Sequence, residues 1–253
     1  MKNEIVLSNR LETLISMVKP CKNMADVGCD HGFVTIKLLK NNICEHIYAM
    51  DVNKGPIERA GQNLNAYNIS EKQATLICAN GLEGLKCGMV DSIFIAGMGG
   101  PLMAGILQRG EAVAKACKQL VLQPQSEIDE FRSFLVQNGY FIEDEKMVYE
   151  EGIFYPMMSV RPLGTDEKPY ALTKAELEYG PVLLKKRDLI LKDFLNRSLR
   201  LNVEIIENLK REILASGTTP DNEQKRNRLA LRVEELGRKN EMIKECLKSY
   251  EEV

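Results

Sequence analysis

The stretch Met24-Ala25-Asp26-Val27-Gly28-Cys29-Asp30-His31-Gly32 decides how the rest of the chain is arranged. An apolar run ends at Gly28, and an amphipathic segment follows from Phe33 to Leu39, which is the pattern of a strand, a tight turn and a helix. Glycine in such a turn lets the backbone pass close to a ligand, and the helix start presents unpaired N–H groups. The sequence therefore predicts a crevice of nucleotide size at the end of this strand.

This turn carries carboxylates where a dinucleotide-binding turn carries glycines. Its spacing is Asp26-x-Gly28-x-Asp30-x-Gly32, whereas the turn that holds a pyrophosphate reads Gly-x-Gly-x-x-Gly. Carboxylates repel phosphate and attract cations, and S-adenosylmethionine (SAM) has an ammonium and a sulfonium but no phosphate. The turn favours SAM as the ligand, with Asp26 and Gly28 at its methionine end. The alternative is a plain strand-to-helix connection, which uses the same residue types.

The composition is that of an ordinary globular protein. The 253 residues are 44% hydrophobic and 28% charged, and the net charge of −2 gives no global sign of nucleic-acid binding. Seven cysteines without a Cys-x-x-Cys pair favour reduced thiols in a cytoplasm, and two histidines are too few for a His-rich metal cluster. The first twenty residues lack a signal-peptide core, and no stretch reaches the roughly 20 apolar residues of a membrane span. We expect a cytoplasmic protein with no metal, no membrane contact and no obligate protein partner.

Strands alternate with helical patterns along the first two thirds of the chain. After the first strand, the pattern predicts strands at 46–50, 74–79, 90–95 and 118–122. Residues 140–149 and 153–161 then alternate apolar and polar positions around Glu150-Glu151-Gly152, which is the pattern of a hairpin. A series that ends in an antiparallel hairpin is closer to the methyltransferase sheet than to the all-parallel dehydrogenase sheet, so the expected fold class is α/β.

The ends of the second and third strands carry two more candidate cofactor contacts. Asp51, followed by Val52, lies where an acidic side chain accepts both hydroxyls of a ribose in a doubly wound sheet. The alternative is a turn residue that caps the next helix. Asn80 and Gly81 follow the third strand, where an amide could bind an adenine amino group, and a bare turn is the alternative.

The fourth and fifth strands also end in unusual residues. The fourth runs into Ala96-Gly97-Met98-Gly99-Gly100, and two glycine-rich strand ends in one sheet are hard to explain as connections alone. We expect Ala96, Gly97 and Met98 to contact the cofactor. Gly99 and Gly100 are expected to face the substrate, together with Gln123 after the fifth strand.

Two long helical patterns follow a linker at 162–169. They run from 181 to 214 and from 220 to the end, with Thr219 as the N-cap of the second. Their apolar positions are spaced alternately four and three apart, which predicts an antiparallel coiled-coil hairpin. The predicted seam residues are Leu191, Leu195, Ser198, Asn202, Ile205 and Leu209 in the first helix, and Leu229, Val233, Leu236, Asn240, Ile243, Leu247 and Tyr250 in the second.

Folding the chain back near residue 220 brings Asn202 opposite Asn240, and a buried amide pair there would fix the register. We therefore expect two domains, a SAM-dependent methyltransferase domain at 1–165 and a helical coiled-coil domain at 170–253.

Basic residues are concentrated in this second domain. Residues 185–200 contain six basic and two acidic side chains, and residues 225–239 contain the same numbers. Exposed helix faces are usually charged, so a plain solvated surface is one interpretation. The other is an electrostatic contact with a phosphate backbone. The candidate substrate-binding residues are Lys185, Lys186, Arg187, Arg197 and Arg200.

Taken together, these motifs resemble the bacterial tRNA adenine-N1 methyltransferases that modify adenine 22 of tRNA, the TrmK family. The resemblance covers almost the full length of the chain. It rests on Ser8-x-Arg10-Leu11, Ala25-Asp-Val-Gly-Cys-Asp-His31, Asn80-Gly-Leu-Glu83, Ala96-Gly-Met-Gly-Gly100, Leu122-Gln-Pro124, Glu151-Gly152 and Gly180-Pro181. Asn80, Gln125 and Asp51 depart from the family pattern, which has Asp, Asn and Glu there.

The resemblance implies a Rossmann-like SAM domain, tRNA as the partner, methylation of adenine N1, and a coiled coil that aids tRNA binding. Adenine N1 has an in-plane lone pair, so positioning rather than deprotonation is the main task of the enzyme. We expect Asp30 and His31 to orient the base or to accept a proton, although His31 could simply cap its helix. Two other functions stay open: a SAM methyltransferase for another RNA or a small molecule, and a non-catalytic SAM-binding interaction protein.

Overall fold

The protein, as a computed structural model, is described for residues 5–216 and 220–251. These residues form two compact units that divide between Val182 and Leu183. The expected N-cap Thr219 lies outside the described residues.

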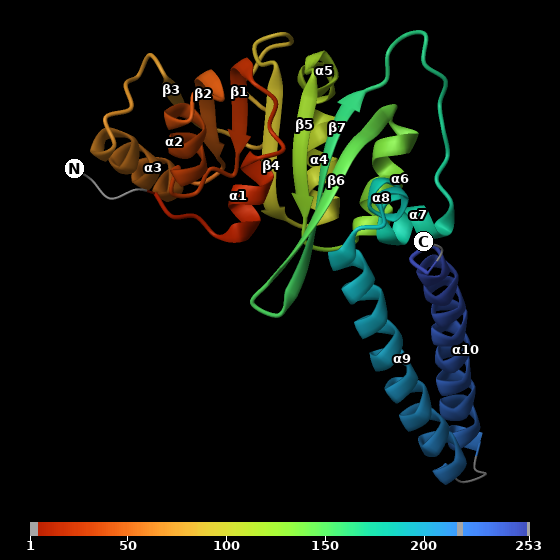
Figure 1. Cartoon of the computed structure of the whole chain (residues 1–253). Coiled ribbons are helices and arrows are strands. Elements are labelled where there is room, and N and C mark those ends of the chain that lie inside the picture. The colour runs from red at the N-terminus through yellow and green to blue at the C-terminus, as the bar shows by residue number, and fades with distance from the viewer. Residues whose placement is uncertain (1–4, 217–219, 252–253) are drawn as a thin grey trace. The chain divides into compact units, whose positions relative to one another are not determined.

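The first unit is built on one mixed sheet. Within the described residues, seven strands follow the order β3-β2-β1-β4-β5-β7-β6 (Figure 1). The strands are β1 (Cys21–Val27), β2 (Cys44–Asp51), β3 (Ala74–Cys78), β4 (Ser92–Met98), β5 (Gln119–Pro124), β6 (Tyr140–Glu150) and β7 (Ile153–Pro162). The first five strands run parallel, whereas β7 pairs antiparallel with both β5 and β6. The predicted α/β fold with an antiparallel hairpin at one end is confirmed.

Helices cover both faces of this sheet. They are α1 (Asn9–Ile15), α2 (Phe33–Lys40), α3 (Lys54–Ala66), α4 (Gly100–Arg109), α5 (Glu111–Ala116), α6 (Ile128–Gln137) and α7 (Lys174–Tyr179). Because successive strand residues point to opposite faces, Met24 packs with α1, α2 and α3, whereas Ala25 packs with α4, α5 and α6. None of the helices in the described part of the chain has both the length and the apolar composition to cross a membrane.

The segment after β7 stays in the first unit because a buried ion pair anchors it. Arg132 on α6 donates to Glu145 on β6 at 2.9 Å and also donates to backbone carbonyls of α7. Glu145 in turn accepts from the backbone N–H of Val182 at 2.9 Å. The units therefore divide later than the linker at 162–169, where the sequence places the domain boundary. The domain assignment itself stays a prediction.

The helical pattern from 181 to 214 is interrupted, so the prediction of one continuous helix there is wrong. It forms α8 (Pro181–Lys186) and α9 (Leu189–Ala215). Arg187 lies between them with a φ of +53°. The Asp188 carboxylate then accepts hydrogen bonds of 2.9 Å from the N–H groups of both Ile190 and Leu191. A new N-cap at Asp188 explains the break, because it satisfies N–H groups that start a second helix.

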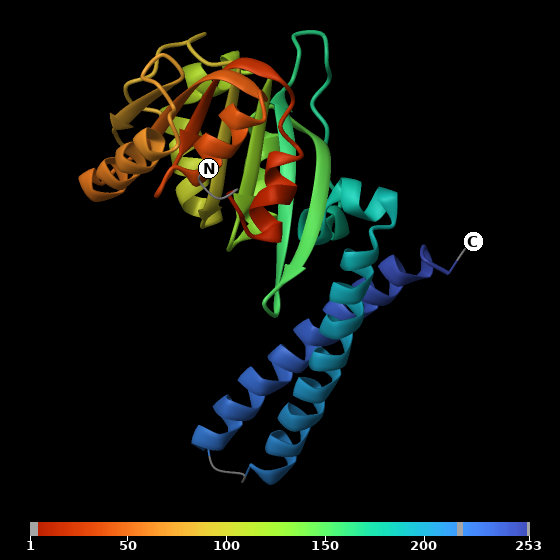
Figure 2. The same ribbon diagram turned by 60° about the vertical axis from the view of Figure 1, so that its left-hand side comes forward.

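The helices α9 and α10 (Pro220–Lys248) pack against each other. In Figure 2 the blue α10 crosses behind the teal α9. Asn202 donates a hydrogen bond of 2.9 Å to Asn240, so the predicted amide pair and register are confirmed. The predicted seam of α10 is confirmed, with Leu236 and Ile243 buried. On α9 the buried face shifts by one residue from the predicted seam. Ile205, predicted in the seam, is 42% exposed, whereas Ile206 is half-buried. A straight helix of 3.6 residues per turn drifts away from a strict seven-residue repeat.

Candidate active site

A cavity of about 440 Å³ lies at the carboxyl ends of β1, β2 and β4. The strand order reverses between β1 and β4, which is where ligands bind in open α/β sheets. Eight of the predicted cofactor and catalytic residues line it: Asp26, Gly28, Asp30, His31, Asp51, Ala96, Gly97 and Met98. The fold thus brings three separate turns of the sequence to one site.

Gly28 makes the first of these turns possible. It has a φ of +79°, and its N–H donates to the carbonyl of Met50 at 2.8 Å. A Cβ at this position would meet Cε of Met98, the flexible end of that side chain. The left-handed backbone conformation is therefore what favours glycine here.

Asp26 supplies a buried carboxylate to the cavity. Its Oδ2 accepts a hydrogen bond of 2.6 Å from the hydroxyl of Thr35. Burial raises the pKa of Asp26 to about 6, and the hydrogen bond from Thr35 opposes part of that rise. A cationic group that enters the cavity would favour the ionised carboxylate, so the position suits an ammonium.

Asp51 lies at the end of β2 with one oxygen available to a ligand. Its Oδ1 accepts from the N–H of Asn53 at 2.8 Å, and Asn53 rather than Asp51 is the N-cap residue of α3. Among the described residues, Oδ2 accepts no hydrogen bond from protein. Val52, also expected at the cofactor, is 61% exposed and does not line the cavity.

Asp30 and His31 form a polar pair at the cavity mouth. Asp30 has a φ of +47°, and its Oδ2 lies 3.6 Å from Nε2 of His31. Its other oxygen lies 3.6 Å from Arg59, and the ring of His31 stacks on Phe33 with centroids 6.2 Å apart. The side chains of Asp30 and His31 are 65% and 47% exposed, so a nucleobase can reach them. Asp30 is thus placed where it could orient His31, and the roles of both residues stay predictions.

Two predicted adenine contacts lie outside this cavity. Asn80 accepts a hydrogen bond of 3.4 Å from Arg109. Gly81 packs on α4, where an added Cβ would come within 2.9 Å of Ile106. Their roles at the cofactor stay predictions.

Gly99 and Gly100 also have a packing role that the sequence did not indicate. A Cβ on Gly100 would lie 2.8 Å from the carbonyl oxygens of Ser126 and Glu127, and one on Gly99 would lie 2.9 Å from the Ser126 hydroxyl. Small residues are needed here so that the start of α4 can approach the turn before α6. Contact of these glycines with substrate stays a prediction.

Gln123 is fully buried and all of its hydrogen-bonding partners belong to the protein. Its Oε1 accepts from Arg10 at 2.6 Å and from the N–H of Gly97 at 3.2 Å. Its Nε2 donates to the carbonyl of Pro124 at 2.9 Å. Gln123 therefore helps to position the lining of the cavity, and its contact with substrate stays a prediction.

Arg10 is a site residue that the sequence analysis missed, although it lies within a motif quoted there. It lines the cavity from α1, and its guanidinium lies 5.3 Å from the centroid of the Tyr155 ring. Within the described residues, no group of three or more His, Cys, Asp or Glu side chains is arranged to hold a metal ion. The predicted basic residues lie in the other unit, on α8, on α9 and between them.

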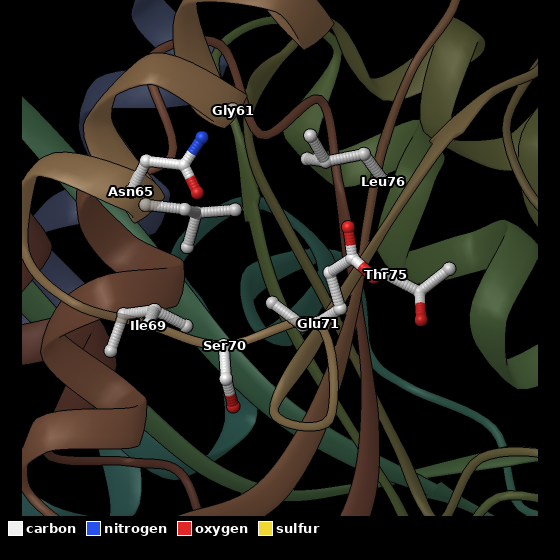
Figure 3. A pocket seen from close by; sticks show the side chains of 9 residues that line it. Gly61, Asn65, Ile69, Ser70, Glu71, Thr75 and Leu76 are labelled. Carbon is white, nitrogen blue, oxygen red and sulfur yellow. The ribbon is translucent and has the colours of Figure 1, made fainter.

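A second cavity, of about 420 Å³, lies between α3 and β3 at the edge of the sheet (Figure 3). Its lining includes Ala74, the first residue of β3, and Glu71 just before it. It therefore lies near the amino end of its strand, away from the glycine turns. This position makes it a weaker candidate for the active site.

The sheet order and the acidic, glycine-lined cavity define the class of Rossmann-like methyltransferases. The family described as "Methyltransferase domain" matches residues 7–158. A curated protein of Bacillus subtilis (strain 168), tRNA (adenine(22)-N(1))-methyltransferase, is 30% identical over 243 residues, which cover 92% of this chain and 97% of that protein. The chain belongs to this tRNA (adenine(22)-N(1))-methyltransferase family.

Two solved structures agree over nearly the whole chain. The B. subtilis m1A22 tRNA methyltransferase TrmK has a TM-score of 0.77 at 26% identity, covering 96% of this chain and 99% of its own. The Streptococcus pneumoniae protein Sp1610, solved in complex with SAM, has a TM-score of 0.73 at 28% identity, covering 96% of this chain and 100% of its own. The similarity therefore includes the C-terminal helices as well as the sheet.

Proposed function

We propose that this protein transfers the methyl group of SAM to N1 of adenine 22 in tRNA. The observation that carries the proposal is the 30% identity to the B. subtilis enzyme over 92% of this chain. The S. pneumoniae complex with SAM supports the choice of cofactor.

The lining of the cavity at the carboxyl ends of β1, β2 and β4 fits SAM. When bound, SAM supplies an electrophilic methyl group on a sulfonium sulfur. The buried carboxylate of Asp26 provides a counter-charge for the ammonium, and Oδ2 of Asp51 can accept a hydrogen bond from a ribose hydroxyl. The turns at Gly28 and Gly97, which have φ values of +79° and +77°, leave backbone groups accessible to the ligand.

The chain's residues act on the base by positioning it. Adenine N1 attacks with its in-plane lone pair, so no residue has to remove a proton first. A nucleophile held in line with its target reacts far faster than one free in solution. Asp30 lies 3.6 Å from the His31 ring, and His31 orients the adenine through its exocyclic amine.

We assign tRNA binding to the basic residues of α8 and α9, which with α10 form a coiled-coil hairpin. Lys185 and Arg200 are exposed and have no ion pair within the described residues. Several basic residues of α10, in contrast, are paired with acidic side chains, as Arg232 is with Glu235 of its own helix at 2.7 Å. Replacing both Lys185 and Arg200 by Ala should weaken tRNA binding. It should also reduce the slope of the logarithm of the binding constant against the logarithm of salt concentration by about one per lost phosphate contact. Lys244→Ala, at an exposed lysine of α10, is the matched control.

We also place this activity in the cytoplasm. All seven cysteines lie in the described residues and are free thiols. Free thiols persist in a reducing compartment, where tRNA would also be available as substrate.

Deletion of the gene tests the proposal in the cell. Mass spectrometry of nucleosides from purified tRNA should show the loss of 1-methyladenosine, and reverse transcription should locate the loss at position 22. Unchanged 1-methyladenosine at that position would contradict the proposal.

A further inference from the structure

We propose that the target adenine is held in a small cavity beside the cofactor cavity, where the Gln125 amide binds its N6 and N7 edge and leaves N1 free. This inference rests on the proposed function and adds the subsite that recognises the base. It uses Gln125, a residue that the sequence analysis noted without giving it a role.

The small cavity has a volume of about 180 Å³ and lies between the end of β5 and the start of β7. It is lined by Pro124, Gln125, Ile128, Phe154, Tyr155 and Pro156, together with Ile153. Proline and aromatic side chains make up much of this lining. Such side chains offer flat apolar surfaces on which a nucleobase can stack.

Gly97 of the cofactor cavity lies close to Gln125 of the small cavity. Gly97 lines the cofactor cavity, and a Cβ built on it would lie 3.7 Å from Nε2 of Gln125 and 3.9 Å from Nη1 of Arg10. Arg10 lines the cofactor cavity as well, and its guanidinium lies over the ring of Tyr155 in the small cavity. A base in the small cavity would therefore lie next to the cofactor.

The order of the strands supports this division of the site. Asp26 near the end of β1 and Asp51 at the end of β2, both assigned to SAM, lie on one side of the reversal in strand order. On the other side, Gly97 near the end of β4 still lines the cofactor cavity, whereas Gln125 follows β5, one strand further from the reversal. The substrate can approach from the β5 side without displacing the cofactor.

Gln125 has the chemistry that adenine requires. Its side chain is exposed, and within the described residues its amide makes no hydrogen bond to protein, whereas every polar atom of the Gln123 amide is in use. A glutamine amide can accept from N6 of adenine and donate to N7 at the same time. Guanine presents two acceptors on that edge, so the amide cannot satisfy both. This contact leaves N1, on the other edge, free for methylation.

The test combines a protein variant with a modified substrate. Methylation rates are measured for the wild type and for Gln125→Ala, each with tRNA carrying adenine or 7-deazaadenine at position 22. Replacing N7 by carbon should slow the wild type about 10-fold or more. Gln125→Ala should be slowed by a similar factor on normal tRNA and should lose nothing further with 7-deazaadenine.

Two control measurements accompany these rate comparisons. Gln137→Ala, at an exposed glutamine whose amide bonds only to Ser133 of its own helix, should retain wild-type rates on both substrates. SAM affinity, measured by calorimetry, should be the same in Gln125→Ala as in the wild type, because Gln125 does not line the cofactor cavity.

The outcomes separate this inference from the proposed function. Absence of methylation by the wild type on normal tRNA would overturn the function and this subsite with it. If the wild type methylates normal tRNA but 7-deazaadenine slows both proteins equally, the subsite alone is overturned. Full activity of Gln125→Ala on normal tRNA would also overturn the subsite alone. Loss of SAM binding in Gln125→Ala would also overturn it.

Discussion

Arg10 on α1 donates a hydrogen bond of 2.6 Å to the side-chain oxygen of Gln123 at the end of β5, 113 residues further along the chain. The same oxygen accepts from the backbone N–H of Gly97 at 3.2 Å. One buried amide therefore fixes both the N-terminal helix and the turn after β4 against the cofactor cavity.

Gln123→Ala should lower both stability and activity. The substitution leaves the N–H of Gly97 and the guanidinium of Arg10 without their shared acceptor, which should cost about 1–3 kcal/mol of unfolding free energy. Urea unfolding measures this cost. Methylation assays under conditions in which the variant is folded should show a rate lower by at least about 10-fold, because a small displacement of catalytic groups is costly. Unfolding free energy equal to that of the wild type would contradict the positioning role of Gln123.

The buried carboxylate of Asp26 should make stability depend on pH. Its pKa is raised to about 6 in the fold from an ordinary value of 3.8, so the fold favours the neutral form. Its stabilising contribution is full below pH 4 and is lost as pH rises through 6, by about 3 kcal/mol in total. In thermal unfolding curves measured between pH 4 and pH 7, the Asp26→Asn variant should not show this loss of stability with rising pH. A variant with the wild-type pH profile would show that Asp26 does not titrate in this range.

SAM binding should have the opposite dependence on Asp26 ionisation. If the carboxylate contacts the ammonium, binding favours the ionised form, and affinity should fall by up to about 10-fold per pH unit below pH 6. Calorimetry between pH 5 and pH 8 measures the profile. The Asp26→Asn variant should bind SAM weakly at every pH, and a wild-type affinity that stays flat below pH 6 would rule out this contact.

The buried ion pair of Arg132 and Glu145 should be sensitive to loss of one partner. The two side chains are 1% and 0% exposed and 2.9 Å apart, so Arg132→Leu leaves a buried carboxylate unpaired. We expect a loss of about 3–5 kcal/mol in urea unfolding, and we expect Arg132→Leu with Glu145→Leu to recover part of it. A double variant less stable than the single one would contradict this expectation, and would show that the hydrogen bond from the Val182 N–H to Glu145 matters more than the unpaired charge.

The amide pair of Asn202 and Asn240 should fix the register of α9 and α10. Asn240→Leu alone removes the acceptor of the 2.9 Å hydrogen bond and should lower thermal stability by about 1–3 kcal/mol. Leu at both positions should restore or raise stability while weakening the preference for one register. Disulfide trapping between cysteines placed on the two helices would reveal whether alternative registers are populated in the double variant.

Most of the fold could be predicted because its signals are local. Alternation along 140–149 and 153–161 predicts β6 and β7, and the spacing around Asn240 predicts the buried face of α10. The break at Arg187 and Asp188 was not predicted, since Asp188 reads equally well as an ordinary helical residue until its capping bonds are seen. The helix α7 was missed even though Thr173 and Glu176 have the spacing of a capping box.

The site residues that lie at the ends of strands could be predicted from the sequence. Asp26, Gly28 and Asp51 lie together because the carboxyl ends of parallel strands share one edge of the sheet. The roles of Arg10 and Gln123 could not be predicted, because their hydrogen bond joins residues far apart in the sequence. The packing of Gly100 against the turn before α6 could not be predicted either, because packing and ligand contact leave the same glycine signal in a sequence.

The most direct test of the central claim is methyl transfer in vitro. Purified protein is incubated with isotope-labelled SAM and unmodified tRNA that carries either adenine or guanine at position 22. The account predicts that label enters the adenine-22 tRNA as 1-methyladenosine, up to one methyl group per molecule, and that the guanine-22 tRNA stays unlabelled. Equal labelling of both tRNAs, or no labelling of either, would contradict it.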